Sequence, residues 1–493
     1  MNILIDTNII IPLEPGSLAD LEINTELALQ FHSLVQKSEN VAYVPPAIEH
    51  DFSRDKNVER ANLRKTLVKR YNIIDSPPPV TILDTTHVGT PEFGSNDYVD
   101  NCFLASLKGD AVDYLVTEDK GIHKKAKKVD LQSRVLYLKD AISLLQDFFD
   151  ETPPPPPSVE TKKVYTLDER DPIFSSLRKD YSPGFDPWIQ KCKLQHRDAY
   201  VIFNKGGTSM AGICILKKED YLPTGESGKT LKLCTFKVSE TQHGNRYGEL
   251  LLKTVFDYAD TNNYQHLYFT TFPKHHDLIE FAKSFGFDSI EKQDEDEIFM
   301  QKFLVFSKED TLKYSPLDFH VKFGPRVTLF ESNSSFIVPI KPEFHDVLFP
   351  EMREELSLFP DQKPCGNSIK KAYLSNSATK LLKPGDNVLF YRSKFKPSIT
   401  AIGIVESFIR STDANQIARY VGSRTVYRYA DIANMCTKSK RDTLAIKFRY
   451  VKHLESSIGI KELKENSVLN GAPQSITKIK PEGVEWIRQK LKM

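Results

Sequence analysis

The chain has 493 residues, of which 40% are hydrophobic and 27% are charged, and its formal net charge is +1. Because a single hydrophobic core stops growing at about 250–300 residues, this length predicts several domains. No apolar run approaches the roughly 18 residues that a membrane span needs, and the six cysteines are scattered, which argues against a transmembrane protein, a disulfide framework and a thiolate zinc site.

The first part of the chain alternates short β-rich runs with helical stretches. The runs NILI, NVAYV and DYLV are separated by helical segments such as LALQFHSLVQ, and DAISLLQDFF follows them. This alternation is typical of an α/β/α fold with a parallel sheet, which we predict over residues 1–151. Five consecutive prolines, Pro153–Pro157, then indicate a semi-rigid linker, which we assign to residues 152–161.

Carboxylates follow the strands of this first domain. In a parallel sheet the carboxyl ends of the strands meet at one edge, where such folds build their sites. Carboxylates that gather there repel one another unless a divalent cation neutralises them. Alternatively, each acid could be a turn or N-cap residue on its own, and Asp113, which precedes its strand, is predicted to be a turn residue. The acids that could converge are Asp6, Glu49, Asp97, Asp100 and Asp119.

The order IDTNII, Glu49, DNCFLASL and LVTEDKG resembles the PIN nuclease domain. The resemblance implies a ribonuclease that depends on Mg²⁺ or Mn²⁺, in which a metal-bound water attacks the phosphorus in line. Asp97 remains an alternative ligand to Asp100, and Asn8 and Thr117 would be supporting polar residues. The catalytic, metal-facing carboxylates implied by the family are Asp6, Glu49, Asp100 and Asp119.

The second domain, predicted over residues 162–304, is rich in strands. DAYVIFN, MAGICILKK and LKLCTFKV are followed by the helix GELLLKTVFDYA, the strand HLYFTTF and the helix DLIEFAKSF. Gly244 and Gly248 lie between a strand and an amphipathic helix, where exposed N–H groups would suit a pyrophosphate. A simple strand-to-helix turn would explain the same two glycines.

This order resembles the α+β fold of GNAT acetyltransferases, with QHGNRYGELLL as the acetyl-CoA loop. Arg246 stands where the family usually has a glycine, and Ala282 replaces a tyrosine that often protonates the leaving thiolate. Either another group serves as the acid, or the domain binds acyl-CoA without turnover. The resemblance implies acetyl-CoA contacts from Phe236 and Val238 and from the loop residues His243, Gly244, Asn245, Arg246, Tyr247 and Gly248.

From Val305 to the C-terminus the chain is basic, with 31 Lys and Arg against 20 Asp and Glu. The window from Lys370 to Arg449 holds 16 of these basic residues and 5 acidic ones, interleaved with aromatic residues as in RYVGSRTVYRYAD. Lys and Arg neutralise phosphates, and Tyr and Phe can stack on unpaired bases, which favours a nucleic-acid partner. Strands whose aromatic side chains face the core and whose basic side chains face solvent would produce the same sequence pattern.

The runs NVLFYRS, TAIGIVESF and TLAIKFRYV predict a small β-barrel within residues 305–493. The segment GNSIKKAYLSNSATKLLKPGDNVLFYRSKFKPSITAIGIVE resembles the ASCH/EVE group of PUA-like domains. The resemblance implies recognition of RNA or a modified base. The candidate contacts are Ser368, Lys370, Tyr391, Arg392, Ser393 and Lys394.

Together these features predict an α/β multidomain endoribonuclease whose basic domain presents RNA, with tRNA as one candidate, and whose second domain senses or uses acetyl-CoA. Such a fusion suggests a toxin-like or antiviral effector with an inhibitory partner protein, and it leaves an oligomer open. The alternative is an N-acetyltransferase that modifies an RNA-linked or protein amine, with the first domain as a scaffold. A third hypothesis is a non-catalytic RNA-binding regulator. The N-terminus lacks a secretory signal, so we expect a cytoplasmic protein without membrane partners.

Overall fold

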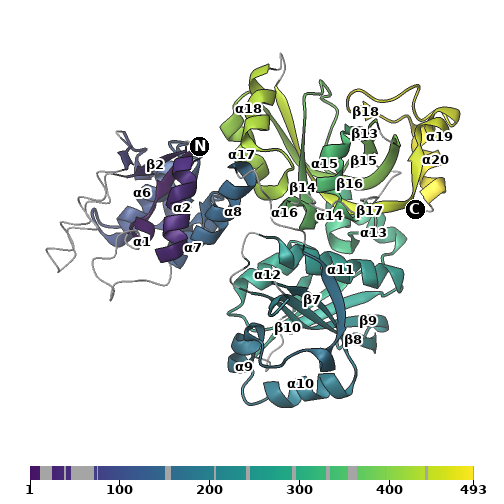
Figure 1. Cartoon of the computed structure of the whole chain (residues 1–493), viewed down its shortest axis with the longest axis horizontal. Coiled ribbons are helices and arrows are strands. Elements are labelled where there is room, and N and C mark those ends of the chain that lie inside the picture. The colour runs from purple at the N-terminus through teal and green to yellow at the C-terminus, as the bar shows by residue number, and fades with distance from the viewer. Residues whose placement is uncertain are drawn as a thin grey trace. The chain divides into compact units, whose positions relative to one another are not determined.

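The computed structural model divides into two compact units (Figure 1). Unit 1 comprises Met1–Glu151, Asp413–Ser423 and Arg428–Ala430, and unit 2 comprises Thr152–Thr412, Arg424–Tyr427 and Asp431–Met493. Within the described part of the chain, no helix is long and apolar enough to cross a membrane. The structure describes residues 1–10, 25–37, 40–45, 71–74, 76–149, 157–204, 207–239, 242, 245–290, 296–328, 333–352, 363–394, 396–438 and 442–491.

Unit 1 contains a five-stranded sheet in the order β3-β2-β1-β4-β5, in which all neighbouring strands are parallel. The predicted parallel α/β sheet is therefore present. In this order β1 and β4 lie side by side, so the residues that follow them share one edge of the sheet. The strands are β1 (Asn2–Ile5), β2 (Val41–Val44), β3 (Asn72–Ile73), β4 (Tyr114–Val116) and β5 (Val135–Leu136).

Helices cover both faces of this sheet. Leu4 and Leu115 belong to a core cluster with buried residues of α6 and α7, whereas Ile3 and Val116 lie against α8. Successive residues of a strand point to opposite faces, so α8 lies across the sheet from α6 and α7. The helices are α1 (Thr7–Ile10), α2 (Thr25–Lys37), η3 (Val80–Ile82), α5 (Thr85–Val88), α6 (Asn96–Lys108), α7 (Lys120–Lys128) and α8 (Leu138–Phe149).

The first half of unit 2 contains a seven-stranded sheet in the order β11-β12-β10-β9-β8-β7-β6. Strands β9 and β10 are parallel, and the other neighbours are antiparallel. The α+β fold predicted for this part is present. The strands are β6 (Val159–Lys163), β7 (Asp198–Phe203), β8 (Met210–Tyr221), β9 (Ser227–Val238), β10 (His266–Thr271), β11 (Asp288–Ile290) and β12 (Ile298–Phe303).

Two pairs of helices enclose this sheet (Figure 1). Leu231 and Leu233 pack with buried residues of α11 and α12 on one face, and Ile213 and Ile215 pack with residues of α10 on the other. The helices and short 3-10 turns are η4 (Val164–Thr166), η5 (Pro172–Phe174), α9 (Ser175–Asp180), α10 (Phe185–Leu194), α11 (Tyr247–Thr261) and α12 (His276–Lys283).

A close backbone approach joins this sheet to helix α14 (Pro316–Phe323). Gly286 has φ +82°, and a Cβ added to it would lie 1.9 Å from the carbonyl oxygen of Val321, so only glycine fits there. The buried amine of Lys302 donates to the carbonyls of Val321 (3.0 Å) and Lys322 (2.7 Å). It therefore satisfies carbonyls at the C-terminal, negative end of α14.

The second half of unit 2 contains a six-stranded sheet in the order β14-β17-β16-β15-β13-β18. No pairing among the described strands joins β14 to β18, so the predicted closed barrel is not confirmed. The strands are β13 (Ser335–Ile340), β14 (Lys370–Ser375), β15 (Asn387–Arg392), β16 (Ser398–Ser411), β17 (Thr443–Gly459) and β18 (Thr477–Lys478). The helices of this part are α13 (Lys308–Lys313), α14, α15 (Pro342–Leu348), η7 (Pro350–Met352), α16 (Pro364–Asn367), α19 (Ile460–Glu465) and α20 (Pro481–Leu491). Helix α17 (Ala414–Val421) belongs to unit 1, whereas η8 (Gly422–Arg424) and α18 (Tyr429–Lys438) each begin in unit 1 and end in unit 2.

Candidate functional site

The parallel strands β9 and β10 separate partway along their length. They pair from Thr230–His266 to Lys232–Tyr268, although β9 continues beside β8 to Val238 and β10 continues beside β12 to Thr271. Beyond Lys232, the β10-facing edge of β9 has backbone groups that β10 does not pair, and such groups need other hydrogen-bond partners. An extended ligand with amide groups is a suitable partner for this edge.

Residues predicted to contact acetyl-CoA lie together at this separation. Phe236 and Val238 pack against the core cluster that includes α11 and α12. A Cβ added to Gly248 would lie 3.6 Å from Phe281 and 4.0 Å from Phe236, and the two phenyl rings are 5.9 Å apart. Gly248 thus leaves space beside an apolar wall. We did not predict Phe281, although the α12 sequence DLIEFAKSF contains it.

The start of α11 is suited to an anion. Arg246 is its N-cap residue and adopts the left-handed backbone conformation (φ 59°, ψ 26°). The first N–H groups of a helix have no acceptor within the helix, and the helix dipole makes this end positive. The preceding Asn245 donates from its side chain to Gln242 Oε1 at 3.0 Å. Burial raises the pKa of Tyr247, and the predicted loop residues His243 and Gly244 lie outside the described residues.

A phenol and a carboxylate meet at the carboxyl end of β10. The Tyr181 hydroxyl, from the α9–α10 turn, donates to Glu297 Oε1 at 2.6 Å, and Glu297 immediately precedes β12, whose first residue pairs with Thr271. The ring of Tyr181 lies 4.9 Å from that of Phe272. Burial and Glu297 raise the pKa of Tyr181, so the phenol stays protonated. The carboxylate of this pair can accept a proton, whereas Ala282, at the place of the family's tyrosine, is buried in the core and has no group that could donate one.

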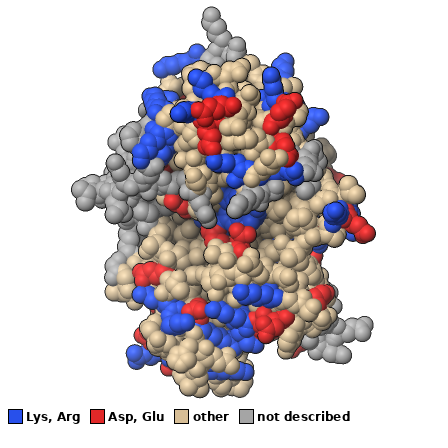
Figure 2. Space-filling view, turned by 90° about the vertical axis from the view of Figure 1, so that its right-hand side faces the viewer, with Lys and Arg blue, Asp and Glu red and all other residues tan. Residues whose placement is uncertain are grey.

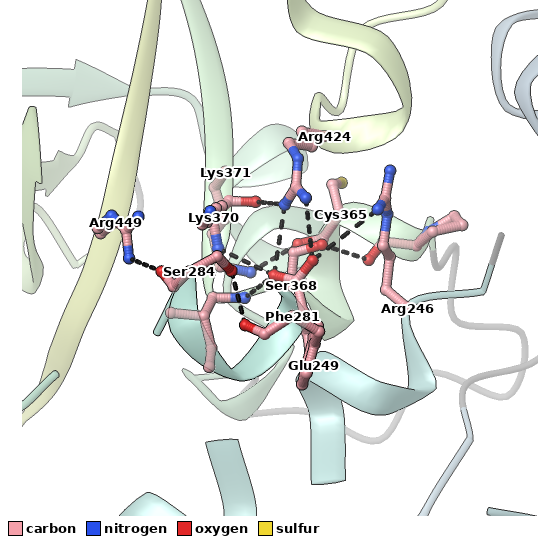
Figure 3. A network of polar contacts seen from close by, with 12 residues as sticks. Arg246, Glu249, Phe281, Ser284, Cys365, Ser368, Lys370, Lys371, Arg424 and Arg449 are labelled. Atoms are coloured by element: carbon pink, nitrogen blue, oxygen red, sulfur yellow. Dashed lines mark hydrogen bonds and ion pairs between the residues drawn. The ribbon is translucent and has the colours of Figure 1, made fainter. Parts of the chain in front are cut away.

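The first turn of α11 also contacts the second half of unit 2 (Figure 3). Glu249 is 4% exposed, and its Oε2 accepts from the N–H groups of Ile369 (2.9 Å) and Lys370 (3.1 Å). Its Oε1 lies 3.1 Å from Arg424 Nη2 and 3.9 Å from Arg246 Nη1. Burial alone would raise the pKa of Glu249, but Arg424, Arg246 and the Lys370 N–H lower it to about 2. The carboxylate is therefore ionised, and its charge is paired.

Two of the predicted RNA contacts are buried in this structure. Ser368 is 0% exposed and donates to Pro364 O, and Tyr391 is 1% exposed within the core of the six-stranded sheet. Neither side chain reaches the surface in this structure, so their contact with RNA stays a prediction that the exposure does not favour. Lys394 alone among the six predicted contacts is exposed, and it lies in the β15–β16 turn.

The side chains of the other three predicted contacts are partly or largely buried. Arg392 is 7% exposed, and Ser393 is half-buried, with its hydroxyl donating to Ile340 O at 3.1 Å. The Lys370 amine lies over the ring of Phe285 at 5.2 Å. Burial and Arg449 lower the pKa of Lys370 to about 8. Much of the basic window therefore serves packing within unit 2 rather than one open surface.

The visible surface agrees with this conclusion. Figure 2 shows one face on which Lys and Arg side chains are mixed with Asp and Glu side chains rather than gathered in one continuous patch. Arg449, also in the basic window, is 6% exposed. It donates to Ser284 O and Glu406 Oε1, both at 2.9 Å. The count of basic residues in the sequence thus overstates the charge that faces solvent.

In unit 1, Asp6 and Thr117 follow the adjacent strands β1 and β4 as predicted. Asp6 is 5% exposed, and its Oδ2 accepts from Asn8 Nδ2 (2.7 Å) and Thr117 Oγ1 (2.5 Å). Asn8 and Thr117 thus hydrogen-bond Asp6, and their role as supporting residues of a metal site stays a prediction. Asp113 lies at the opposite end of β1, where it accepts from the Asn2 N–H at 2.8 Å, in agreement with its prediction as a turn residue.

Three of the other predicted acids, all within the described residues, have protein partners. Asp119 is the N-cap residue of α7 and accepts from the Gly121 N–H at 2.5 Å. Lys125 Nζ bonds Asp97 Oδ1 (2.8 Å) and Asp100 Oδ2 (2.9 Å). Burial raises the pKa of Asp100, Lys125 lowers it, and Asp119 and Asp97 raise it further. Asp119 therefore has the N-cap role that we weighed as an alternative to a metal site, whereas the ion pair of Asp97 and Asp100 with Lys125 was not predicted.

The described residues contain no group of three or more His, Cys, Asp or Glu side chains that could hold a metal ion. Glu49, the fifth predicted ligand, lies outside the described residues. The carboxylates described here therefore do not fit the Mg²⁺ or Mn²⁺ site that the PIN resemblance implied, because a lysine already neutralises two of them.

Comparisons with known families support two of the three predicted domains. Residues 161–287 match the family model described as the acetyltransferase (GNAT) family, and residues 370–490 match the model of the EVE domain. A GNAT-type domain and an EVE-type domain are therefore present in this chain. The PIN-like assignment of unit 1 received no such support. A search of curated proteins found no match.

Solved structures similar to parts of the chain are of the same two kinds. An ASCH protein from Zymomonas mobilis is 14% identical, with 31% of this chain and 94% of that chain covered and a TM-score of 0.25. A GNAT-family acetyltransferase from Staphylococcus aureus Mu50 is 15% identical, with 30% and 100% covered and a TM-score of 0.25. A GNAT-family acetyltransferase from Desulfovibrio desulfuricans is 15% identical, with 30% and 100% covered and a TM-score of 0.24.

Proposed function

We propose that this chain is an acetyl-CoA-dependent N-acetyltransferase whose acceptor is an amine on, or bound to, RNA. The separation of β9 from β10 beside the start of α11 carries this proposal. The unpaired edge of β9 suits an amide-bearing chain, and the free N–H groups of α11 suit its phosphates. The GNAT match over residues 161–287 supports the same cofactor.

The side chains around this separation have distinct roles in the proposed reaction. Acetyl-CoA, when bound, supplies an acyl group activated as a thioester. Phe236, Val238 and Phe281 form the apolar wall that excludes water from it. Glu297 would take the proton that the acceptor ammonium must lose before the amine can act as a nucleophile, and Tyr181 orients Glu297 through their 2.6 Å hydrogen bond. As the C–N bond to the acceptor forms, the C–S bond of the thioester breaks, and the thiolate leaves and is protonated by water.

The EVE-type domain is the reason for proposing RNA as the acceptor or its carrier. Domains of this kind suggest RNA binding, and the exposed lysines Lys394 and Lys396 lie on the β15–β16 turn of this domain. Lysine ammonium groups bind phosphates without reading sequence. We therefore place the RNA backbone at this turn.

One assay tests the proposed activity. The full chain is incubated with acetyl-CoA labelled in the acetyl group, together with cellular RNA, a basic peptide or spermidine as acceptors. Transfer of label to RNA, or to an amine in an RNA-dependent way, is the expected result. Transfer that is unaffected by RNA would exclude the RNA part of the proposal. A chain that neither transfers label nor binds CoA in calorimetry would exclude an acetyltransferase altogether.

A second candidate function is the metal-dependent endoribonuclease that the first domain resembles. The observation that favours it is the position of Asp6 and Asp119 after adjacent parallel strands. The test is cleavage of RNA with Mn²⁺, with EDTA, and with the variant Asp6→Asn, in which the side-chain shape is kept and the charge is removed. Cleavage that Asp6→Asn leaves unchanged would exclude this site. The toxin-like or antiviral role, the inhibitory partner and an oligomer stay predictions.

A further inference from the structure

Glu249 lies in an unusual place for a buried carboxylate. It is the third residue of α11, so its negative charge lies within the helix turn whose free N–H groups are proposed to hold the phosphates of CoA. Two negative groups at one helix end repel each other, and burial strengthens that repulsion because the surrounding dielectric is low. The carboxylate therefore opposes phosphate binding unless other charges offset it.

The EVE-type domain supplies such a charge. Arg424 ends η8 and approaches both oxygens of Glu249, with Nη2 at 3.1 Å from Oε1 and Nη1 at 3.3 Å from Oε2. Its Nη1 also donates to the Lys370 carbonyl at 2.6 Å, which fixes the guanidinium between β14 and α11 (Figure 3). A guanidinium held at two points matches a carboxylate in geometry as well as charge.

The short helix α16, just before the EVE match, also contacts the loop that precedes α11. The side-chain amide of Asn367, at the end of α16, donates to the Asn245 carbonyl at 3.0 Å. Arg246, the next residue, has the left-handed backbone conformation (φ 59°), which is unfavourable for a non-glycine residue. Its Nη1 lies 3.9 Å from Glu249 Oε1. One carboxylate thus faces two arginines, and the local charge at the start of α11 is positive.

We propose that Arg424 is a positioning residue for the CoA phosphates, supplied to the GNAT-type domain by the EVE-type domain, and that it acts by neutralising Glu249. This inference rests on the proposed function, because it assumes that acyl-CoA binds at the start of α11. Its consequence is that the acetyltransferase site is complete only when the EVE-type domain is docked. Any ligand of the EVE-type domain that displaces η8 would then weaken cofactor binding.

The test compares CoA with pantetheine, which has the same arm but no phosphates, by calorimetry on the full chain. For Arg424→Met, we expect the affinity for CoA to fall about tenfold and the affinity for pantetheine to stay unchanged. In the double variant Glu249→Gln/Arg424→Met, most of the lost CoA affinity should return, because the uncompensated charge is gone. If Arg424→Met only loosened the contact between the two domains, the affinities for CoA and for pantetheine would both fall, and adding Glu249→Gln would not restore them.

Arg449→Met is the matched control. It removes a contact between the same two domains, to Ser284 O at 2.9 Å, without touching Glu249, so the ratio of CoA to pantetheine affinity should stay as in the wild type. If Arg424→Met does not fold, Glu249→Gln alone decides the question, because it should bind CoA at least as tightly as the wild type. The inference is overturned if Glu249→Gln weakens CoA binding or if Arg424→Met binds CoA normally. A wild type that binds no CoA overturns the proposed function and this inference with it.

Discussion

The side-chain amines of Lys253 and Lys371 both donate to the carbonyl oxygen of Gly366, at 3.3 and 3.0 Å. Lys253 lies on α11 of the GNAT-type domain and Lys371 on β14 of the EVE-type domain. Lys371 is 0% exposed, and Lys253 also bonds Glu351. Burial lowers the pKa of Lys371 most, the charge of Lys253 lowers it further, and the result is about 7.

This arrangement predicts a pH-dependent stability for unit 2. In the unfolded chain Lys371 keeps its proton up to about pH 10.4, so between pH 7 and 10 the unfolded state binds more protons than the folded state. The free energy of unfolding should therefore rise with pH in this range, by at most about 1.4 kcal/mol per pH unit. In Lys371→Met this rise should be smaller. Denaturant titrations at pH 7 and 9 measure it, with Lys461→Met, whose side chain is 90% exposed, as the control.

The ion pair between Glu249 and Arg424 predicts a strong coupling in stability. Arg424→Met leaves a buried carboxylate with fewer partners and should destabilise unit 2 by about 2–4 kcal/mol. Adding Glu249→Gln should recover part of this loss, so a double-mutant cycle should give a coupling of more than about 1 kcal/mol. Additive effects of the two substitutions would show that the charges are not coupled.

The local features of the fold could be predicted from the sequence, whereas the contact between domains could not. Asp6 was located because a strand ends where an apolar run stops, whereas the adjacency of β1 and β4 is set by the strand order, which the sequence did not reveal. Glu249 and Arg424 lie 175 residues apart in the sequence, and neither lies in a motif from which the contact could be predicted. Ser368 and Tyr391 were assigned to RNA because a basic and aromatic sequence does not say which side chains the fold will bury, as it buries Tyr391 in the core of the six-stranded sheet.

Substituting Glu297 should lower the kcat of the proposed reaction strongly. Glu297→Gln keeps the size of the side chain but cannot accept a proton, so kcat should fall about 10²- to 10⁴-fold at neutral pH. Tyr181→Phe removes only the hydrogen bond to Glu297 and should have a smaller effect. Labelled acetyl transfer measures both, and Glu280→Gln, whose side chain is 52% exposed on α12, is the control. Wild-type kcat in Glu297→Gln would exclude its role as the base.

Lys125 predicts how unit 1 responds to metal. If Mn²⁺ binds near Asp100, it must displace the ammonium group that bonds Asp97 and Asp100. Lys125→Met frees both carboxylates and should raise the Mn²⁺ affinity about tenfold, because it removes a competing positive charge. Calorimetric titration measures this, and the exposed Lys127 on the same helix provides the control Lys127→Met. Equal Mn²⁺ affinity in the wild type and Lys125→Met would show that these acids are not metal ligands.

His320 is a buried side chain of unit 2 whose protonation at low pH should destabilise the fold. Its Nδ1 lies 2.8 Å from the Val327 carbonyl, and burial lowers its pKa to about 3, although the hydrogen bond to Val327 raises it in part. Because the unfolded-state pKa is about 6.5, the unfolded chain binds more protons between pH 6.5 and 3, and stability should fall as the pH falls through this range. In His320→Asn the fall should be shallower, whereas the exposed His276, changed in the same way, should leave the pH profile of the wild type unchanged.

The β15–β16 turn carries the most direct prediction for RNA binding. Lys394 and Lys396 are exposed, and both have positive φ (68° and 45°), so this turn presents two lysine side chains to solvent. Each phosphate contact to single-stranded RNA contributes about −0.7 to the slope of log affinity against log salt. Lys394→Gln/Lys396→Gln should weaken RNA binding and reduce the magnitude of this slope by about 1.4. Lys461→Gln removes a similarly exposed charge from α19 and should change neither quantity if the RNA binds at the turn. An unchanged slope in the double variant would place the RNA elsewhere on the chain, because counterion release reports the number of phosphate contacts and not the fold.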